Sequence, residues 1–322
     1  MRVAITGVAG YVGSVLSAEL LTRGHQVTGL DNLMRGGDAL LGMYGNPAFC
    51  FHRGDVRDDA TVEQIIADVD AVVHLAAIVG DPACARDPEL ACAVNQAASV
   101  RLAAAARDAG VGRFVFASTC SNYGKMGNGD GFVDEASPLQ PLSVYAETKV
   151  AVERFLLESR WPSGFTPTVL RLATVYGLSY RPRFDLTVNE FSAELLKRGV
   201  LTVYGESFWR PYVHVRDVSR AILAVLEAPP ERIRGEVFNV GATEENYQKR
   251  HLVEMIARRL PQARVEYVHK EEDPRDYRVR FDKIRRVLGF VPERSVEFGI
   301  DEILGALRDG VVGDPFEPRF RN

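Results

Sequence analysis

Residues 1–32, MRVAITGVAGYVGSVLSAELLTRGHQVTGLDN, decide the fold of this chain. The apolar run over residues 2–6 predicts a buried strand, and the apolar run over residues 26–30 predicts a second one. Between them, residues 11–22 carry apolar side chains at a spacing that is typical of a helix. A strand, a helix and a second strand in this order predict the first unit of a parallel sheet that is covered by helices.

Three glycines, Gly7, Gly10 and Gly13, form the predicted turn between this first strand and the first helix. They permit a tight turn, a close approach of the backbone to a pyrophosphate, and close packing of the helix on the strand. At the start of the helix, the N–H groups of Tyr11 and Val12 offer hydrogen bonds and partial positive charge to phosphates. The motif therefore predicts a dinucleotide site, although many such triplets are only turns.

Asp31 ends the second predicted strand, where a dinucleotide would place its adenosine ribose. A carboxylate there accepts hydrogen bonds from the ribose hydroxyls and repels a 2′-phosphate, which favours NAD over NADP. Arg35 is close enough in sequence to leave NADPH open. Further cofactor contacts are expected just after the second, third and fourth strands, at Asn32, Asp55, Val56, Leu75, Ala76 and Ala77.

Composition and charge exclude several classes of protein. The chain has 322 residues, of which 46% are hydrophobic and 25% are charged, as in ordinary globular proteins. This length allows one large domain or two modest ones. The net charge of −4 argues against nucleic-acid binding by bulk charge. No stretch approaches the roughly 18 apolar residues that a membrane span needs, so we expect no membrane partner.

The cysteines and the N-terminus suggest the compartment. Cys50, Cys84, Cys92 and Cys120 form no CxxC pair and match no zinc-binding spacing. We therefore interpret them as reduced thiols and expect no metal site. The first residues lack the long apolar segment and the cleavage site of a signal peptide, so we expect a cytoplasmic protein.

Strands and helices continue to alternate through residue 172. Strands are predicted over residues 49–53, 71–75, 113–117 and 168–172, and helices over residues 61–66, 88–109 and 144–158. This pattern predicts an α/β fold with a Rossmann-type doubly wound parallel sheet over residues 1–172, which binds the dinucleotide at its switch point.

The second half is less regular. Helices are predicted over residues 186–198, 213–226, 252–260 and 299–308, with a strand over residues 237–240. We expect residues 173–322 to form mostly a smaller C-terminal lobe that binds the substrate and packs directly on the first domain. The tail, residues 313–322, holds two prolines and is expected to be a surface segment.

Tyr145 and Lys149 stand four residues apart in SVYAETK, so a helix places them on one face. An ammonium beside a phenol stabilises the phenolate and lowers the phenol pKa from about 10. Such a tyrosine can act as a general base toward a sugar hydroxyl near neutral pH. The same spacing is also common in surface pairs, which remain an alternative for the motif alone.

Several motifs occur together in the order of a known family. The chain resembles the extended short-chain dehydrogenase/reductase family, in its NAD-dependent nucleotide-sugar epimerase/dehydratase group. Besides the glycine turn and the Tyr145–Lys149 pair, the resemblance rests on Asn95, LDN at 30–32, GDV at 54–56, HLAA at 74–77, FASTCSNYG at 116–124, RLATVYG at 171–177 and RPYVHVRDV at 210–218. These motifs span nearly the whole chain.

The resemblance implies roles for individual residues. Thr119 would hydrogen-bond the reacting hydroxyl, Tyr145 would be the acid/base, and Lys149 would bind the nicotinamide ribose and tune Tyr145. Asn95 matches an asparagine near the cofactor. Three residues are expected to bind the nucleotide-diphosphate part of the substrate, namely Asn189, Arg210 and Arg275.

Departures from the family pattern narrow the reaction. The 4,6-dehydratases of the family carry Asp-Glu after the threonine, where this chain has Cys120 and Ser121. A thiol and a hydroxyl replace that pair poorly, which disfavours a dehydratase and a decarboxylase. Cys120 is interpreted as packing or, alternatively, as an acid/base. Thr174 stands where the family has asparagine, so Cys120, Ser121 and Thr174 are expected to line an altered substrate pocket.

These observations favour a nucleotide-sugar epimerase, with C4 as the favoured carbon, that oxidises its substrate transiently to a keto sugar with tightly bound NAD. The alternative is an NAD(P)H-dependent nucleotide-sugar 4-ketoreductase, and a non-catalytic dinucleotide sensor is a third reading. The nucleotide, the sugar and the inverted carbon stay open. The resemblance also implies a homodimer that pairs the helices expected near residues 91–108 and 144–158.

Overall fold

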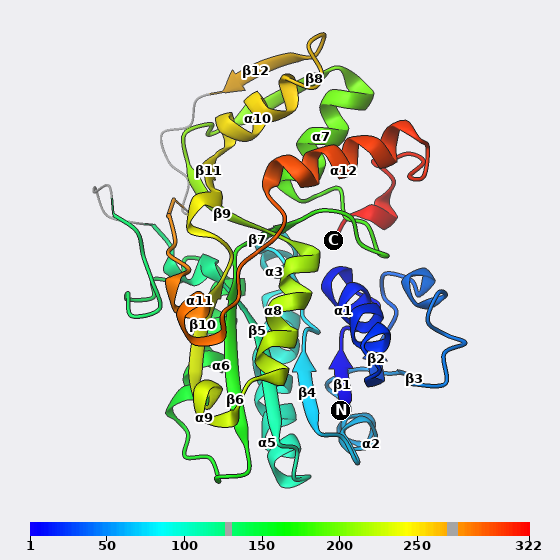
Figure 1. The fold of residues 1–322 in the computed structure, drawn as a ribbon, viewed down its shortest axis with the longest axis vertical. Coiled ribbons are helices and arrows are strands. Elements are labelled where there is room, and N and C mark those ends of the chain that lie inside the picture. Colours follow the sequence, from blue (N-terminus) through cyan, green and yellow to red (C-terminus); the bar gives the residue numbers. More distant parts are fainter. Residues whose placement is uncertain (126–130, 269–275) are drawn as a thin grey trace.

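A computed structural model describes residues 1–125, 131–268 and 276–322. Its centre is a seven-stranded sheet in the order β10-β6-β5-β4-β1-β2-β3, and every neighbouring pair is parallel (Figure 1). The strands are β1 (Arg2–Thr6), β2 (Gln26–Asp31), β3 (Phe49–Arg53), β4 (Ala71–His74), β5 (Arg113–Thr119), β6 (Thr166–Leu172) and β10 (Glu236–Val240). The strand order reverses between β1 and β4. This sheet confirms the predicted Rossmann-type α/β fold.

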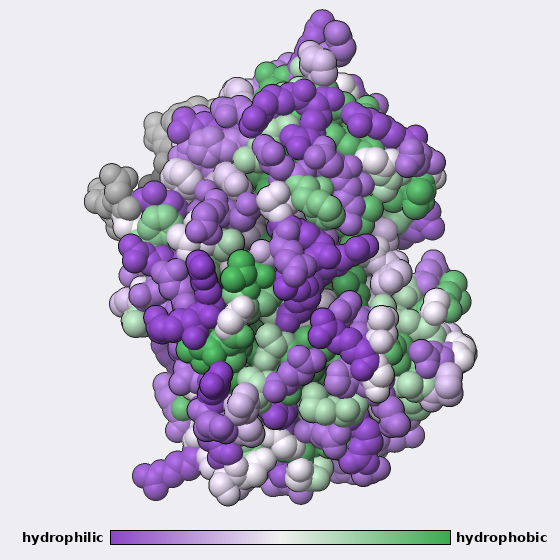
Figure 2. All heavy atoms as spheres, in the orientation of Figure 1, coloured by the Kyte–Doolittle hydropathy of each residue, from purple (hydrophilic) through white to green (hydrophobic). Residues whose placement is uncertain are grey.

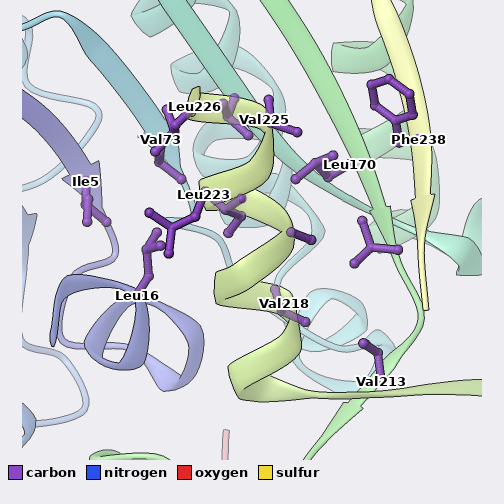
Figure 3. Close-up of a cluster of buried hydrophobic side chains, with 14 of the residues drawn as sticks. Ile5, Leu16, Val73, Leu170, Val213, Val218, Leu223, Val225, Leu226 and Phe238 are labelled. Atoms are coloured by element: carbon purple, nitrogen blue, oxygen red, sulfur yellow. The ribbon is translucent and has the colours of Figure 1, made fainter. Parts of the chain in front are cut away.

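Helices cover both faces of the sheet. One face is packed against α1 (Tyr11–Thr22) and α8 (Val215–Glu227), and the other against α2 (Asp59–Ile66), α5 (Ser99–Asp108) and α6 (Val144–Glu158). Figure 3 shows the α8 side of the first face, where Leu223 meets Leu16 of α1 and Ile5 and Val73 of the sheet. All four side chains are at most 1% exposed. This burial fixes the sheet as the rigid base of the molecule.

A second, smaller body lies above the carboxyl ends of the strands (Figure 1). Its apolar core joins α7 (Thr187–Arg198), α10 (Lys249–Ala257) and α12 (Val296–Arg308) with the parallel pair β8 (Val200–Tyr204) and β12 (Arg264–Val268). A three-stranded sheet connects the two bodies, with β7 (Thr174–Tyr176), β9 (Trp209–His214) and β11 (Asn246–Gln248). Hydrophilic side chains cover most of the face seen in Figure 2.

The chain crosses between the two bodies more than once after residue 172. The helices α8, α9 (Pro230–Ile233) and α11 (Asp282–Leu288), together with β10, pack with the large sheet rather than with the smaller body. The division into residues 1–172 and 173–322 as functional units stays a prediction. The tail expected on the surface instead ends in a 3₁₀ turn (Pro318–Phe320), where Phe320 is 9% exposed.

One predicted helix is divided in the structure, and one short helix was not predicted. The helix expected over residues 88–109 consists of α4 (Pro88–Ala91), a π-helical segment (Cys92–Ala98) and α5. A short helix that the sequence analysis did not predict, α3 (Asp81–Arg86), precedes them. Shorter 3₁₀ turns lie at Asp38–Leu40, Cys120–Tyr123 and Thr243–Glu245. In the described part of the chain, no helix has the length and apolar character needed to cross a membrane.

A buried ion pair joins β6 to α6 behind the sheet ends. Arg171 donates to Glu153 through Nη2 at 2.7 Å and through Nε at 3.0 Å, and both side chains are at most 5% exposed. Glu153 also accepts from Asn122 at 2.7 Å and from the Ser118 hydroxyl. Arg171 donates further to the Tyr123 hydroxyl at 3.0 Å. Four donors therefore surround the buried carboxylate, and they supply the hydrogen bonds that a carboxylate away from water requires.

We expect Arg171→Met to lower the free energy of unfolding by about 3–5 kcal/mol, because Glu153 then stays buried without its cation. Urea unfolding followed by circular dichroism measures the change, and Arg171→Met combined with Glu153→Met should restore much of it. Arg23→Met is the control, since its ion pair with Glu19 is half-exposed and should contribute about 0–1 kcal/mol. A loss below 1 kcal/mol in Arg171→Met would contradict this account.

Candidate cofactor and catalytic site

A cavity of about 440 Å³ lies at the carboxyl ends of the parallel strands, where the order reverses between β1 and β4. Open α/β sheets bind ligands at this switch point, because the loops on the two sides of it diverge. The cavity runs from the loops after β2 and β3 to the start of α6. It holds twelve of the thirteen predicted residues that were assigned only to the cofactor: Gly7, Gly10, Tyr11, Val12, Gly13, Asp31, Asn32, Asp55, Val56, Leu75, Ala76 and Ala77.

The glycine turn leaves a cradle that side chains would fill. Gly7 has a φ of +76°, which is the left-handed region that favours glycine. A Cβ on Gly13 would lie 2.1 Å from the carbonyl oxygen of Gly7, and a Cβ on Gly10 would lie 3.0 Å from it. No side chain caps the start of α1, so the first N–H groups of the helix, at Tyr11 and Val12, are available to a phosphate.

Asp31 organises the adenosine end of the cavity. Its carboxylate accepts from the backbone N–H of Ala9 at 3.1 Å and from that of Leu33 at 2.9 Å. Burial raises the pKa of Asp31, and these two N–H groups oppose the rise. In contrast, the Arg57 guanidinium, 2.9 Å away, holds the pKa of Asp55 below its usual value. The two backbone hydrogen bonds hold the loop of Asp31 in place. Because its carboxylate lines the cavity, it can still accept hydrogen bonds from a ligand there.

Asn95 does not line the cavity, unlike the other predicted cofactor residues. It lies in the π-helical segment and is fully buried. Its side chain accepts from the N–H of Ile78 at 2.8 Å and donates to the carbonyl of the same residue at 2.9 Å. Ile78 itself lines the cavity. The structure thus places Asn95 behind the loop that follows β4, where it holds the cavity wall.

Thr119, Tyr145 and Lys149 meet at the other end of the cavity. Thr119 ends β5, and the other two lie on α6, whose first turn is capped by Ser143. The Nζ of Lys149 donates to the carbonyl of Ala117 at 2.9 Å and lies 5.9 Å from the centre of the Tyr145 ring. The three side chains therefore come together as the resemblance implies, and their chemical roles stay a proposal.

The protonation of this pair differs from the sequence expectation. Burial lowers the pKa of Lys149 to about 8. Burial also raises the pKa of the half-buried Tyr145 above 10, and the neighbouring Cys84 and Asp81 raise it further. The expected lowering of the phenol pKa by Lys149 is therefore wrong for the chain's own groups, because desolvation outweighs an ammonium that is bound to Ala117.

Ser121 and Thr174 line the cavity beside Thr119, but Cys120 does not. The thiol of Cys120 donates to the carbonyl of Arg171 at 3.3 Å, and the residue is 1% exposed. Burial raises the pKa of this thiol well above its usual value. Of the two readings of Cys120, this geometry supports packing.

Of the three residues expected at the substrate diphosphate, the structure describes two, and neither belongs to the cavity wall. Asn189 is 1% exposed and bonds the backbone of Gly177 at 3.0 Å and the carbonyl of Arg183 at 2.8 Å. Arg210 lies 5.4 Å from the ring centre of Tyr277, and that ring does line the cavity. Arg275 lies outside the described residues.

Several polar cavity residues were missed by the sequence analysis. Asp81, Arg181, Arg183 and Tyr277 all line the cavity. The Tyr277 hydroxyl lies 3.4 Å from that of Ser121, and Asp81 accepts from Ser143 at 2.8 Å. The cluster of arginine and proline at 181–183 was the signal for two of them, since charged side chains in a loop after a strand end are candidates for binding.

Comparisons with known proteins show the family of this chain. The model of the NAD dependent epimerase/dehydratase family matches residues 3–241, so the chain belongs to that family. It is 28% identical to a UDP-glucose 4-epimerase from Lactobacillus helveticus, over 94% of this chain and 95% of the relative. It is 32% identical to a dTDP-glucose 4,6-dehydratase from Streptomyces griseus, over 92% of this chain and 90% of the relative.

Solved structures are similar along nearly the whole chain. A UDP-glucuronic acid 4-epimerase from Bacillus cereus, crystallised with UDP-glucuronic acid and NAD, superimposes with a TM-score of 0.85 at 25% identity, covering 96% of this chain and 99% of that one. These findings confirm the family resemblance, and they confirm NAD as the cofactor. The side-chain-free glycine cradle and the carboxylate of Asp31 fit that dinucleotide.

We expect Asp31→Asn to weaken NAD binding about tenfold, because an amide accepts hydrogen bonds from ribose hydroxyls less well than a carboxylate. The binding of NADP should improve at the same time, since the negative charge is gone. Displacement titrations with both dinucleotides measure the two affinities. Asp38→Asn removes an exposed carboxylate outside the cavity and should change neither affinity. Equal affinities in Asp31→Asn and wild type would remove Asp31 from the site.

Lys149→Met tests the desolvation of the ammonium. The pKa of Lys149 is about 8 in the folded chain and 10.5 in its unpaired state. Between these values the unfolded chain binds a proton that the folded chain lacks, so wild-type stability rises with pH relative to Lys149→Met. Urea unfolding from pH 8 to pH 10.5 should show that the free energy of unfolding of the wild type rises by about 3 kcal/mol relative to that of Lys149→Met. Lys197→Met, which removes an exposed ammonium, is the control. If the difference in unfolding free energy between wild type and Lys149→Met does not change with pH, the result would contradict the burial of the ammonium.

Proposed function

We propose that this member of the NAD dependent epimerase/dehydratase family is a nucleotide-sugar 4-epimerase. The reaction would oxidise the C4 hydroxyl transiently to a ketone and reduce it again from the opposite face. The observation that carries the proposal is the catalytic end of the cavity. Thr119, Ser121 and Tyr145 present hydroxyls there, while Cys120 is turned toward the carbonyl of Arg171.

The residues after Thr119 argue against elimination of water. Removing water across C5 and C6 needs an acid and a base at the sugar, and in the dehydratases an Asp-Glu pair supplies them. A buried thiol with a raised pKa and the Ser121 hydroxyl are poor substitutes. Asp81 is a cavity carboxylate, but it comes from α3 and accepts from the Ser143 hydroxyl at 2.8 Å. Its position supports a role in holding the start of α6.

The proposed mechanism assigns one proton transfer to the chain. Thr119 hydrogen-bonds the C4 hydroxyl and orients it toward Tyr145. The phenolic oxygen of Tyr145 takes the hydroxyl proton and later returns it. Lys149 would hold the nicotinamide ribose beside Tyr145. The glycine cradle and Asp31 would hold NAD, which would supply the hydride acceptor and donor for C4 and a positive charge that favours the Tyr145 phenolate. The cavity walls keep water from the ketone.

The proposal also covers the substrate, the oligomeric state and the cellular location. The substrate is a nucleotide-diphosphate sugar, whose sugar would contact Ser121, Thr174 and Tyr277 at the catalytic end of the cavity. The family resemblance supports a homodimer through helices of the first domain, and the four free cysteines support a cytoplasmic location. A 4-ketoreductase is the second candidate, because Arg35 lines the cavity with Asp31 and leaves room for an exchangeable NADPH.

Denaturing the purified protein and identifying the released nucleotide separates these candidates. An epimerase should release NAD at about one per chain, because its cofactor is regenerated in each turnover. Incubation with UDP-glucose, UDP-galactose and UDP-glucuronic acid should then give C4 epimers, which nuclear magnetic resonance distinguishes. A 4-keto-6-deoxy product would overturn the proposal in favour of a dehydratase. Turnover that consumes added NADPH would favour the ketoreductase.

We expect Tyr145→Phe to keep its NAD and to lose turnover by about 10²–10⁴-fold, because only the proton-transferring hydroxyl is removed. Nucleotide content after denaturation and the rate of epimer formation measure the two effects. Tyr44→Phe is the matched control, since its phenol is 68% exposed and lies outside the cavity. Turnover near the wild-type rate in Tyr145→Phe would remove Tyr145 from the proton transfer.

A further inference from the structure

The segment after β7 is fastened across the start of α1. The Tyr11 hydroxyl donates to the carbonyl of Gly177 at 2.6 Å, and the Ser179 hydroxyl donates to the carbonyl of Tyr11 at 2.6 Å. The hydroxyls of Ser14 and Ser179 lie 3.2 Å apart. Because α1 begins at the glycine cradle, these contacts hold the segment beside the place where the cradle offers its N–H groups.

The C-terminal residues brace the same segment from the other side. The N–H of Phe184 donates to the carbonyl of Phe320 at 2.8 Å, and the two rings meet edge to face at 5.8 Å. The N–H of Asn322 donates to Asp185 at 3.1 Å. Asn322 also lines the cavity. Residues 320–322 thus form a brace that holds residues 178–186 against the cavity.

Arg181 is the side chain that this brace positions. Its Nη1 donates to the side-chain oxygen of Asn322 at 2.8 Å, and its Nη2 donates to the carbonyl of Arg321 at 3.2 Å. The residue is 8% exposed and lines the cavity. Its Nε is buried and has no acceptor among the residues that the structure describes. A buried donor without a partner is costly, so this N–H marks a position for an acceptor that the chain does not supply.

The charges around Arg181 point to an anion. Its neighbour Arg183 is paired with the Asp185 carboxylate at 2.9 and 2.7 Å, whereas Arg181 donates to neutral oxygens of Arg321 and Asn322. Burial and the charges of Arg183 and Arg35 lower the pKa of Arg181 to about 10, and the charge of Asp31 acts in the opposite direction. A guanidinium that is desolvated, near other cations and short of one acceptor fits a phosphate oxygen.

The surroundings select the dinucleotide as the source of that phosphate. The segment that carries Arg181 is bonded to Tyr11 and Ser14, in the first turn of the helix that follows the glycine cradle. The charge of Asp31, at the adenosine end, reaches Arg181. We propose that Arg181, held by residues 320–322, is a further NAD-binding residue whose Nε–H donates to the diphosphate of the dinucleotide, and that the brace slows release of NAD. This inference rests on the cofactor and not on the proposed epimerisation.

Exchange of bound NAD for isotopically labelled NAD tests the proposal on the protein as purified. Arg181→Met should raise the exchange rate about tenfold or more, because a charge-assisted hydrogen bond to phosphate is lost. Asn322→Ala should raise it less, since Arg181 remains but loses one support. Arg258→Met is the control, because its exposed guanidinium pairs with Glu297 and lies outside the cavity. An exchange rate in Arg181→Met equal to that of the control overturns the proposal.

Two ligand comparisons identify the phosphate. Affinity for ADP, measured as competition with labelled NAD, should fall with the NAD affinity in Arg181→Met, while UDP binding to the NAD-loaded protein should not change. A loss of UDP affinity with unchanged NAD exchange would assign the arginine to the substrate diphosphate instead. A loss confined to NADP would assign it to a 2′-phosphate. Both results overturn the proposal. A purely structural role would lower the melting temperature and weaken ADP and UDP binding alike.

Discussion

The turn from β1 into α1 is the constraint on which the rest of the structure depends. The Cβ of any other residue at position 13 would lie 2.1 Å from the carbonyl oxygen of Gly7, so only glycine allows the helix to leave the strand at this distance. That approach sets α1 against α8 and the sheet, and it leaves the first N–H groups of the helix facing the cavity. Asp31 then bonds the N–H of Ala9, inside the same turn. The need for glycine at position 13 therefore determines the packing of α1 in the core, the position of the glycine cradle and the position of the Asp31 carboxylate.

A second layer of buried charge holds the catalytic end. Arg171 and Glu153 link β6 to α6, and Glu153 lies one helical turn after Lys149, on the same helix. The α6 helix is thus fixed from behind by an ion pair and at its start by Ser143. This rigidity matters because Tyr145 is desolvated and favours its neutral form. If Tyr145 transfers the proton as proposed, its partner must be held at a fixed position, and the network behind α6 would contribute to the reaction through this positioning.

The regular spacing of apolar residues was enough to predict most of the helices and strands. The features that were missed depend on contacts between residues that lie far apart in the sequence. The helices over residues 11–22 and 144–158 were predicted at their observed bounds, because their apolar spacing is regular. The alanine-rich sequence over residues 88–109 is compatible with an α-helix and with a π-helical segment. It therefore did not predict the π-helical segment that carries Asn95. Motif position located Thr119, Tyr145 and Lys149 in the cavity, since their backbone is set by β5 and α6. It did not give the direction of Asn189 and Cys120, whose side chains bond nearby backbone instead.

The residues that close the cavity come from both ends of the chain. Arg181 bonds residues 321 and 322, about 140 positions away, and its segment bonds Tyr11 and Ser14 near the N-terminus. No local pattern encodes such a contact, because each partner looks like an ordinary loop residue. The arrangement nevertheless suits the proposed epimerisation. In that reaction the bound dinucleotide would be reduced and then re-oxidised in each turnover, so its exchange would bring no gain and its loss would leave a keto sugar behind. If the glycine cradle, the segment after β7 and the brace all hold the dinucleotide, as proposed, its release would require several separate contacts to open together, and release would therefore be slow.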